Sequence, residues 1–524
     1  MKKIFLPFIL LYIAGSWSLL AQENVTYSNT NSLTEEEQAF LALLDYESVV
    51  KSAQLLSREI GNRYTSTFRR DMAVEWIVTE LESCGYKPII HQFENNRYTN
   101  NGCFEVDGHK YIYYGPAYAD ETVYQFTNST VTIAGAEVLS WADVSSPFVI
   151  SDGANVAGRA VIVVLSSIQG TGAGATVPSA DNYYNACLTL QNAGAKGVVF
   201  QLPAPRSDFN TSYSRIPNIT TGASVTIPTG TTLYYETHPI IGGLDGNTEV
   251  KLTMEARRDG KSVLAVLPSA TGSKKSVYIT AHFDTTVSGP GMNDNASGTI
   301  MTLEMARAFK NAAFEYNIVF FLCDAEEAGL RGARAYCMEM TDEERENFVA
   351  NYNMDMIATA QEDCIHLFLN INDTTDRSSS QLYAMQESLA NDQRLIEVPE
   401  ALALAKQRDV FNHTFLAAQK LQFDMSRFNI CWDTTTDHWA FVQEATREGN
   451  HFPNMMNAVE YDWRRNEKGT SFEALYHKVG DRYEINFSLE KMKISGDIIS
   501  LAIFFSAKGS VPDMAAIDGL VTLR

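Results

Sequence analysis

The stretch VYITAHFDTTVSGPGMNDNASG, residues 277–298, decides the fold of this chain. Its first four residues are β-branched or aromatic and uncharged, which is typical of a buried strand. This strand delivers His282 and Asp284 at its carboxyl end, and a Gly-Pro-Gly turn then leads to Asp294 between two asparagines. Because ligands collect where the strands of open α/β sheets end, a histidine and two carboxylates placed there indicate a metal site.

Strands and helices alternate around this stretch. Residues 262–268, 277–282 and 317–323 have the pattern of strands, and residues 299–310 form a predicted helix between the last two. Residues 71–86 and 488–507 have helical apolar spacing. The alternation predicts an α/β domain with a mixed, mostly parallel doubly wound sheet flanked by helices.

Composition excludes several classes of partner. The chain has 524 residues and a net charge of −22, which repels nucleic acid and anionic membranes.

Residues 1–22, MKKIFLPFILLYIAGSWSLLAQ, have the layout of a signal peptide cut near Ala21, and no later apolar run is long enough for a membrane anchor. We therefore expect an exported protein, periplasmic or extracellular. Its seven cysteines lack the CxxC spacing of a structural zinc module, and we assign no disulfide.

Further acidic and histidine residues follow later apolar runs. Zinc binds imidazole nitrogen and carboxylate oxygen, and a pair of zinc ions needs several such ligands, one of them bridging. The candidates, in chain order, are His282, Asp284, Asp294, Glu326, Glu327, Asp355 and His477.

Two adjacent glutamates also need a physical reason, because neighbouring carboxylates repel each other. If Glu327 binds metal, Glu326 is left to take a proton from water. The alternative is a solvated acidic turn that opens a helix, where carboxylates favour the helix dipole. The position after a buried strand favours catalysis.

Five motifs occur in order: AHFD, GMNDNASG, CDAEEAGLRGA, NMDMIA and YHKVGD. By these motifs the chain, from about residue 52 to its end, resembles the di-zinc exopeptidase family. That family includes bacterial secreted aminopeptidases, glutamate carboxypeptidase and, as a metal-free relative, the transferrin receptor. The resemblance implies two Zn²⁺ per chain. One is expected on His282, Asp294 and Asp355, and the other on Asp294, Glu327 and His477, with Asp294 bridging.

The resemblance also implies roles around the metals. Asp284 is expected to orient His282 through its second nitrogen, and Glu326 to act as general base toward a metal-bridging water. Tyr476 resembles the phenol that hydrogen-bonds the oxyanion, although a packed tyrosine is the alternative reading. Relatives tend to have a cis peptide after the bridging aspartate, here between Asp294 and Asn295.

The substrate pocket is expected near TTTDHWAF, residues 434–441. Asp437 and His438 lie in this stretch, and His438 is the competitor of His477 for the last metal position. Met292 stands where alanine is common in the family and is expected to narrow the site. Residues 373–430 exceed what compact relatives need and are predicted to add helices or a lid.

The domain prediction follows from composition and from a looser resemblance. Between residues 115 and 255 Gly, Ala, Thr, Ser and Pro increase, with β-rich runs at 161–165 and 198–202. The stretches VAGRAVIVV and NAGAKGVVF resemble the protease-associated domain, a β-rich insert that shapes substrate access. The expected bounds are signal peptide 1–21, N-terminal part of the peptidase domain 22–114, protease-associated insert 115–255 and catalytic domain 256–524.

The function that these expectations favour is a secreted zinc aminopeptidase that hydrolyses N-terminal residues from peptides. An aminopeptidase binds a free α-amine near acidic groups, whereas a carboxypeptidase needs a cationic clamp. A glutaminyl cyclase with one zinc, a carboxypeptidase on the same fold and a non-catalytic binding module remain the alternatives. The preferred side chain and the oligomeric state stay open.

Overall fold

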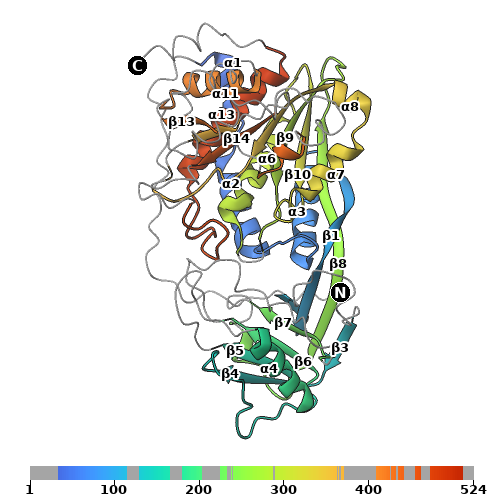
Figure 1. The fold of residues 1–524 in the computed structure, drawn as a ribbon. Coiled ribbons are helices and arrows are strands. Elements are labelled where there is room, and N and C mark those ends of the chain that lie inside the picture. Colours follow the sequence, from blue (N-terminus) through green and yellow to red (C-terminus); the bar gives the residue numbers. More distant parts are fainter. Residues whose placement is uncertain are drawn as a thin grey trace, which may run out of the picture.

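The computed structural model has two lobes, joined by two long strands (Figure 1). It describes residues 33–114, 129–165, 180–202, 225–232, 238, 240–286, 289–362, 364, 367–370, 409–424, 427–431, 435–441, 455–461 and 473–510. The expected signal peptide lies outside these residues. So does most of the predicted addition at 373–430, of which one helix and one strand are described.

One mixed sheet runs through both lobes. Its strand order is β13-β12-β14-β11-β9-β10-β8-β1-β2-β7-β6-β5-β4, and β3 pairs with β8. The strands are β1 Ile89–Val106, β2 His109–Tyr114, β3 Ser129–Ile133, β4 Ala136–Trp141, β5 Ala160–Leu165, β6 Gly197–Gln201, β7 Thr229–Thr232, β8 Val250–Leu267, β9 Ser276–His282, β10 Asn317–Cys323, β11 Phe348–Met354, β12 Leu367–Asn370, β13 Phe428–Cys431 and β14 Met455–Tyr461.

The three predicted strands form the centre of the upper lobe as β8, β9 and β10. β10 pairs in parallel with β9, so that Cys323 lies opposite His282, and antiparallel with β8. Alternate residues of β10 enter different cores: Phe320 packs with the helices of one face, and Phe321 with those of the other. This burial on both faces explains the continuous apolar runs in the sequence.

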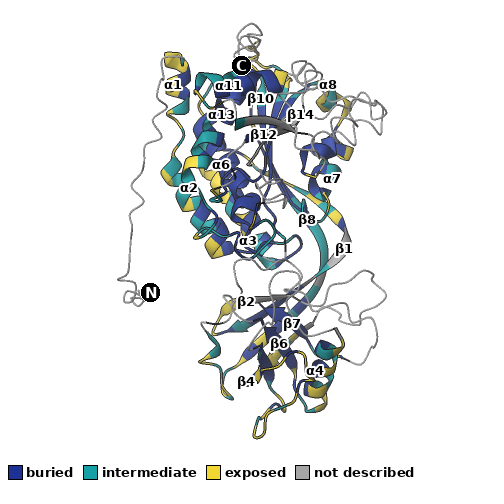
Figure 2. Cartoon of the chain, turned by 60° about the vertical axis from the view of Figure 1, so that its left-hand side comes forward, coloured by how far each residue is buried: buried dark blue, intermediate teal, exposed yellow. Residues whose placement is uncertain are grey.

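Helices cover both faces of this part of the sheet (Figure 2). The larger layer contains the predicted helices, observed as α3, α6 and α13, and α7 lies on the other face. The helices are α1 Glu35–Leu41, α2 Tyr46–Ala53, η2 Gln54–Ile60, α3 Phe68–Ser83, α4 Ala180–Asn192, η5 Met292–Ala296, α6 Ser297–Phe309, α7 Arg331–Glu339, α8 Asp342–Glu346, α11 Asp409–Lys420 and α13 Leu489–Ala507. The predicted mixed α/β class is confirmed.

The lower lobe is a smaller α/β unit. Its strands β4, β5, β6 and β7 are parallel, and α4 packs on one face around a buried cluster that includes Trp141, Tyr183 and Phe200. β1 and β8 run unbroken from one lobe into the other, with a shift in register between Glu94 and Thr99 (Figure 1). The sheet is therefore continuous through the connection.

The structure also bears on membrane-spanning helices and on disulfide bonds. Among the described helices, none combines the length and apolar character needed to cross a membrane. Every cysteine whose side chain is described is a free thiol: Cys84, Cys103, Cys187, Cys323, Cys337 and Cys364.

Candidate metal centre

The candidate ligands gather at the carboxyl ends of three neighbouring parallel strands. His282 is the last residue of β9, Asp355 directly follows β11, and the two glutamates follow β10 in a turn before α7. Asp294 lies in η5, at the start of α6. His477 comes from the segment before α13 and has a left-handed backbone, with φ of 56°. The sheet thus collects residues that are up to 195 positions apart in the chain, from 282 to 477.

The side chains form two groups that share Asp294. In the first group, His282 Nε2 lies 3.3 Å from Asp294 Oδ1 and 3.4 Å from Asp355 Oδ1. In the second, His477 Nε2 lies 3.1 Å from Asp294 Oδ2 and 3.3 Å from Glu327 Oε2. Within each group one donor atom from each residue lies within 4.8 Å of the others. The two oxygens of Asp294 therefore face different groups.

Burial and charge make these groups suited to cations. Burial raises the pKa of Glu326 and Glu327 well above its ordinary value, and neighbouring carboxylates add to the shift. Burial also opposes ionisation of Asp294, but hydrogen bonds from His282 and His477 outweigh it and lower its pKa.

Two buried oxygens of the groups, Glu327 Oε1 and Asp355 Oδ1, accept no hydrogen bond of regular geometry from the described residues. Asp355 Oδ1 keeps its 3.4 Å contact with His282 Nε2. Oxygens of this kind are costly unless a cation or donor reaches them. Each group has three residues, five in all because Asp294 is shared, and their imidazole and carboxylate donors match the preferences of zinc.

Asp284 makes more contacts than the sequence suggested. His282 Nδ1 lies 3.2 Å from the backbone oxygen of Asp284 and 3.6 Å from its Oδ1. The carboxylate also accepts hydrogen bonds from the backbone N–H groups of Glu326, at 3.0 Å, and Glu327, at 3.3 Å. Asp284 therefore connects the histidine with the turn that carries both glutamates.

The carboxylate of Asp481 binds the main chain of the loop around Asp294. Asp481 accepts hydrogen bonds from the N–H groups of Asn293, at 2.8 Å, and Asp294, at 2.9 Å. Asn486 donates to the same carboxylate at 2.8 Å. The peptide between Asp294 and Asn295 is cis, as the resemblance predicted.

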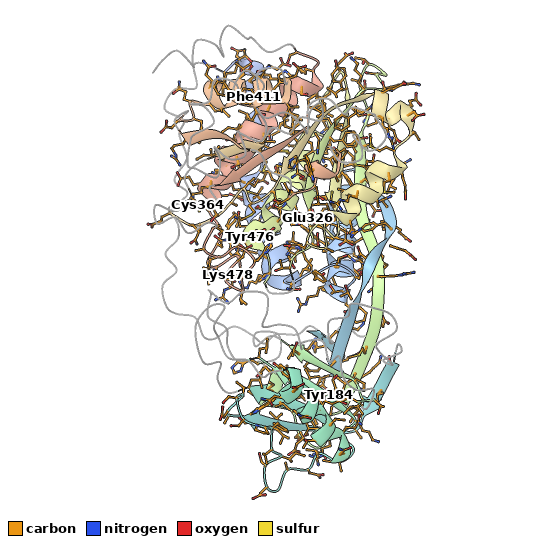
Figure 3. The ribbon with its side chains drawn as sticks, in the orientation of Figure 1. Tyr184, Glu326, Cys364, Phe411, Tyr476 and Lys478 are labelled. Atoms are coloured by element: carbon orange, nitrogen blue, oxygen red, sulfur yellow. The ribbon has the colours of Figure 1, made fainter. Side chains whose placement is uncertain are left out.

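A small depression opens beside both groups. It is lined by Asp294, Glu326, Asp355, Met356, Thr435, Tyr476 and His477. The ring of Tyr476 stacks on His477 with centroids 3.7 Å apart. Burial raises the pKa of Tyr476, and nearby carboxylates raise it further, so its hydroxyl stays protonated and can donate. Figure 3 shows Glu326 and Tyr476 in the same region, with Lys478 toward the lower lobe.

Three predicted pocket residues are placed differently. Asp437 and His438 are fully buried and are absent from the described lining of the depression, which instead includes the nearby Thr435. Burial raises the pKa of Asp437 to about 7. Met292 is also fully buried, and it packs in the main hydrophobic core rather than narrowing the site. The apolar side chain points to the core because η5 buries this face as it enters α6.

Sequence reasoning missed the residues that support the loops. Asp481 lies in the quoted motif YHKVGD but carried no assigned role. Arg63, in GNRYTST, lies more than two hundred positions from the motifs, yet its buried guanidinium donates to backbone oxygens of the segment between His282 and Asp294. A buried arginine has no local pattern, so only a contact across the fold identifies it.

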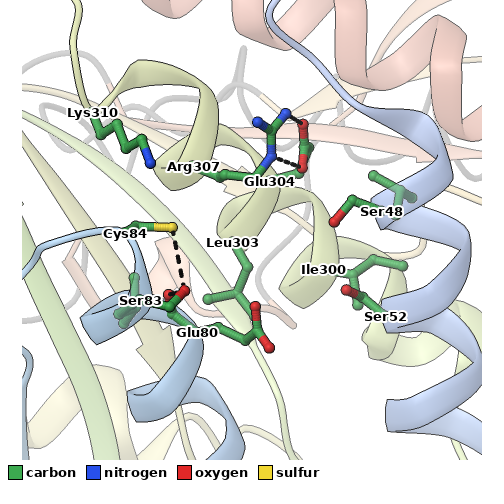
Figure 4. Close-up of a pocket in the computed structure, with 12 residues that line it drawn as sticks. Ser48, Ser52, Glu80, Ser83, Cys84, Ile300, Leu303, Glu304, Arg307 and Lys310 are labelled. Atoms are coloured by element: carbon green, nitrogen blue, oxygen red, sulfur yellow. Dashed lines mark hydrogen bonds and ion pairs between the residues drawn. The ribbon is translucent and has the colours of Figure 1, made fainter.

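A separate cavity of about 190 Å³ lies between α2, α3 and α6 (Figure 4). Ser48, Cys84, Glu304, Arg307 and Lys310 are among its lining residues. Arg307 Nε donates to Glu304 Oε2 at 2.8 Å, so the charges of these two lining residues neutralise each other. Because its lining includes none of the candidate ligands, this cavity is distinct from the candidate centre.

The mixed α/β fold and the two carboxylate–imidazole groups place this protein in the class of α/β metallopeptidases. A solved zinc aminopeptidase from Bacillus subtilis has the same fold, with a TM-score of 0.50 and 20% sequence identity over 89% of this chain and 96% of that chain. Residues 262–503 match the model of Peptidase family M28. This match covers 242 of the 524 residues and supports the resemblance seen in the motifs.

Two curated relatives are aminopeptidases by name. Aminopeptidase YwaD of Bacillus subtilis is 24% identical over 339 residues, which are 62% of this chain and 60% of that protein. An aminopeptidase of Pseudomonas aeruginosa is 40% identical over 83 residues, which are 16% of each protein. The chain therefore spans less than two thirds of the length of these relatives.

Proposed function

We propose that this protein is an exported zinc-dependent aminopeptidase that removes N-terminal residues from peptides. The observation that carries the proposal is the pair of groups that share Asp294, with the Glu326 carboxylate 3.9 Å from His282 Nε2. The names of the curated relatives agree with this activity. Export is inferred from the pattern of residues 1–22.

The ligand assignment follows the two groups. His282, Asp294 and Asp355 would hold one zinc ion, and Asp294, Glu327 and His477 the other. Zinc supplies a Lewis acid that polarises a carbonyl and lowers the pKa of water. Asp294 would belong to both sets of ligands, because its two oxygens face different histidines.

Two side chains of the depression would carry the proton transfers. Glu326 takes the proton of the attacking water and delivers it to the departing amine. The Tyr476 hydroxyl donates a hydrogen bond to the oxygen that becomes negative as the carbonyl is attacked. Asp284 fixes the backbone of Glu326 through a 3.0 Å hydrogen bond, so the base is held in place before substrate arrives.

The lining of the depression supports aminopeptidase over carboxypeptidase activity. Its described residues include three carboxylates and neither lysine nor arginine. A terminal carboxylate therefore finds no cationic clamp among these residues, which a carboxypeptidase would need. We propose that the lower lobe is a protease-associated insert that limits the peptides that reach this depression.

Hydrolysis of aminoacyl p-nitroanilides, before and after dialysis against a chelator, tests the proposal. We expect hydrolysis by the zinc-loaded protein, loss after chelation and recovery with Zn²⁺. N-acetylated versions of the same substrates should resist hydrolysis, because they lack the free amine. Hydrolysis of N-blocked, C-terminally free peptides instead would make the protein a carboxypeptidase.

Metal counting separates the remaining alternatives. Inductively coupled plasma emission spectrometry of the purified protein should give a zinc content close to two ions per chain. A count near one, together with cyclisation of N-terminal glutamine, would identify a glutaminyl cyclase. A protein that binds neither zinc nor substrate would be a binding module on the same fold.

A further inference from the structure

Arg63 is fully buried between the end of η2 and the connection from β9 to η5. Its Nε donates to the backbone oxygen of Phe283, Nη1 donates to that of Pro290 at 2.5 Å, and Nη2 to that of Gly291 at 3.0 Å. Nη1 also donates to Gly61 at 3.1 Å. One guanidinium group thus binds both ends of the connection.

Both ends of this connection carry a residue of the metal centre. Phe283 directly follows His282, and Gly291 lies three positions before Asp294. Residues 62 and 63 make two more contacts with this connection. The backbone N–H of Arg63 donates to Thr285 Oγ1 at 3.0 Å, and Asn62 Nδ2 donates to the backbone oxygen of Thr286 at 2.8 Å. The spacing between His282 and Asp294 is therefore set partly by a segment more than two hundred residues away.

The four hydrogen bonds described above for this guanidinium go to carbonyl oxygens, not to carboxylates. Burial lowers the pKa of Arg63 to about 10, while Asp284, Asp481, Asp294 and Glu327 act against that shift through their charge. Arg63 thus remains a fixed cation behind the acidic groups. A cation at this place repels metal ions, so charge alone would weaken metal binding. Its benefit to the site has to come from geometry.

We propose that Arg63 is a positioning residue of the metal centre, whose planar fork fixes the main chain at both ends of the β9–η5 connection and so sets the separation of His282 and Asp294. The proposal rests on the zinc site of the proposed function. Arginine suits this role because its donors have a rigid planar arrangement, whereas lysine presents its three donors from a single nitrogen.

The test compares Arg63→Lys and Arg63→Gln with the wild type. Zinc affinity is measured by competition with a chelating dye, and backbone amide exchange is measured on the metal-free proteins. We expect both variants to bind zinc about 10- to 100-fold more weakly, as is usual when a residue supporting metal ligands is lost. Amide exchange should accelerate in 283–286 and 289–294, and the visible spectrum of the Co²⁺-loaded protein should change.

The matched control is Arg345→Lys. Arg345 Nη2 also donates to a backbone oxygen, that of Cys337, at 3.2 Å, but Arg345 lies in α8 and contacts none of the candidate ligands through this bond. This variant should keep the zinc affinity and the exchange pattern of the wild type. If neither Arg63 variant folds, Asn62→Ala removes neighbouring bonds to the same connection and should produce a smaller change of the same kind.

Two results would overturn the inference. Unchanged exchange in both segments of the folded variants would show that Arg63 does not fix the connection. Wild-type zinc affinity in Arg63→Lys with weak binding in Arg63→Gln would show that charge matters and the fork does not. If the wild type itself binds no zinc, the proposed function fails, while amide exchange still decides whether Arg63 positions the connection.

Discussion

Asp294 and Glu326 differ in environment although both are buried carboxylates. Asp294 has an imidazole at each oxygen, and these contacts lower its pKa. Burial raises the pKa of Glu326, and the charges of neighbouring carboxylates raise it further, so it binds a proton readily. A group that accepts a proton without being tied to two histidines is suited to general-base chemistry. The two residues can therefore serve different functions within one acidic cluster.

Replacing Glu326 should separate metal binding from catalysis. Glu326→Gln keeps the size of the side chain but cannot accept a proton, so we expect kcat to fall about 10²- to 10⁴-fold. Zinc content should stay at the wild-type value, because Glu326 belongs to neither ligand group. Steady-state kinetics measures kcat, and plasma emission spectrometry of the same sample measures its zinc content. Glu343→Gln, on α8, is the control and should keep full activity.

At the scale of elements, the start of α6 is pressed against the end of β11. A Cβ at Gly298 would lie 2.3 Å from the backbone oxygen of Met354 and 2.7 Å from Asn295 Oδ1. Asn295 Oδ1 accepts from the Gly298 N–H at 2.9 Å, and Asn295 Nδ2 donates to the Met354 oxygen at 2.8 Å. This close contact brings Asp294, at the start of the helix, next to Asp355, at the end of the strand.

Gly298→Ala should therefore destabilise the protein. Helix propensity favours alanine over glycine by about 1 kcal/mol, but overpacking against a backbone oxygen costs about 1–3 kcal/mol or more. We expect a lower midpoint of urea unfolding and weaker zinc binding. Gly242→Ala is the control, because a Cβ there has no atom within 4 Å, and it should leave both measurements unchanged.

Across the whole molecule, the lower lobe contacts the loop of His477 directly. Val479, two positions after this histidine, is 5% exposed and belongs to the hydrophobic cluster of the lower lobe. Gly289, on the β9–η5 connection, also has no room for a Cβ beside the backbone oxygen of Lys478, at 2.4 Å. The loop of His477 is thus enclosed between the two lobes.

Val479→Ala tests whether this contact supports the centre. The loss of two buried carbons should destabilise the fold by about 1–2 kcal/mol, and zinc affinity should fall because His477 gains freedom. Val225→Ala removes the same volume from the same cluster without touching this loop. Calorimetric titration should show weaker zinc binding for Val479→Ala alone. Equal affinities in the two variants would mean that the lobe does not hold His477.

Removal of metal should lower the stability of the entire fold. The candidate ligands come from β9, η5, the turn after β10, the end of β11 and the segment before α13, so zinc bound to them would connect most of the upper lobe. At a free zinc concentration 100 times Kd, binding adds about 2.7 kcal/mol to the folded state. We expect a chelator to lower Tm in differential scanning calorimetry and added Zn²⁺ to restore it. A Tm unaffected by the chelator would contradict the metal assignment.

The strands and helices around the centre could be predicted from sequence because their signals are local. The apolar runs at 262–268, 277–282 and 317–323 are mostly buried, apart from the exposed Val266 and Pro268, and they correspond to the end of β8, to β9 and to β10. The residues that now form the two groups were recognisable because each follows such a run in an ordered motif. Their roles as ligands remain a prediction.

What the sequence determined by itself was the set of strands, the fold class and the side chains able to bind metal, because spacing and motif order lie along the chain. Only the tertiary structure decided that Met292 packs in the core, that Arg63 and Asp481 hold the loop of Asp294, and that Val479 packs with the lower lobe. Those contacts join segments far apart in sequence, and a buried arginine or valine has no local pattern that names its partner.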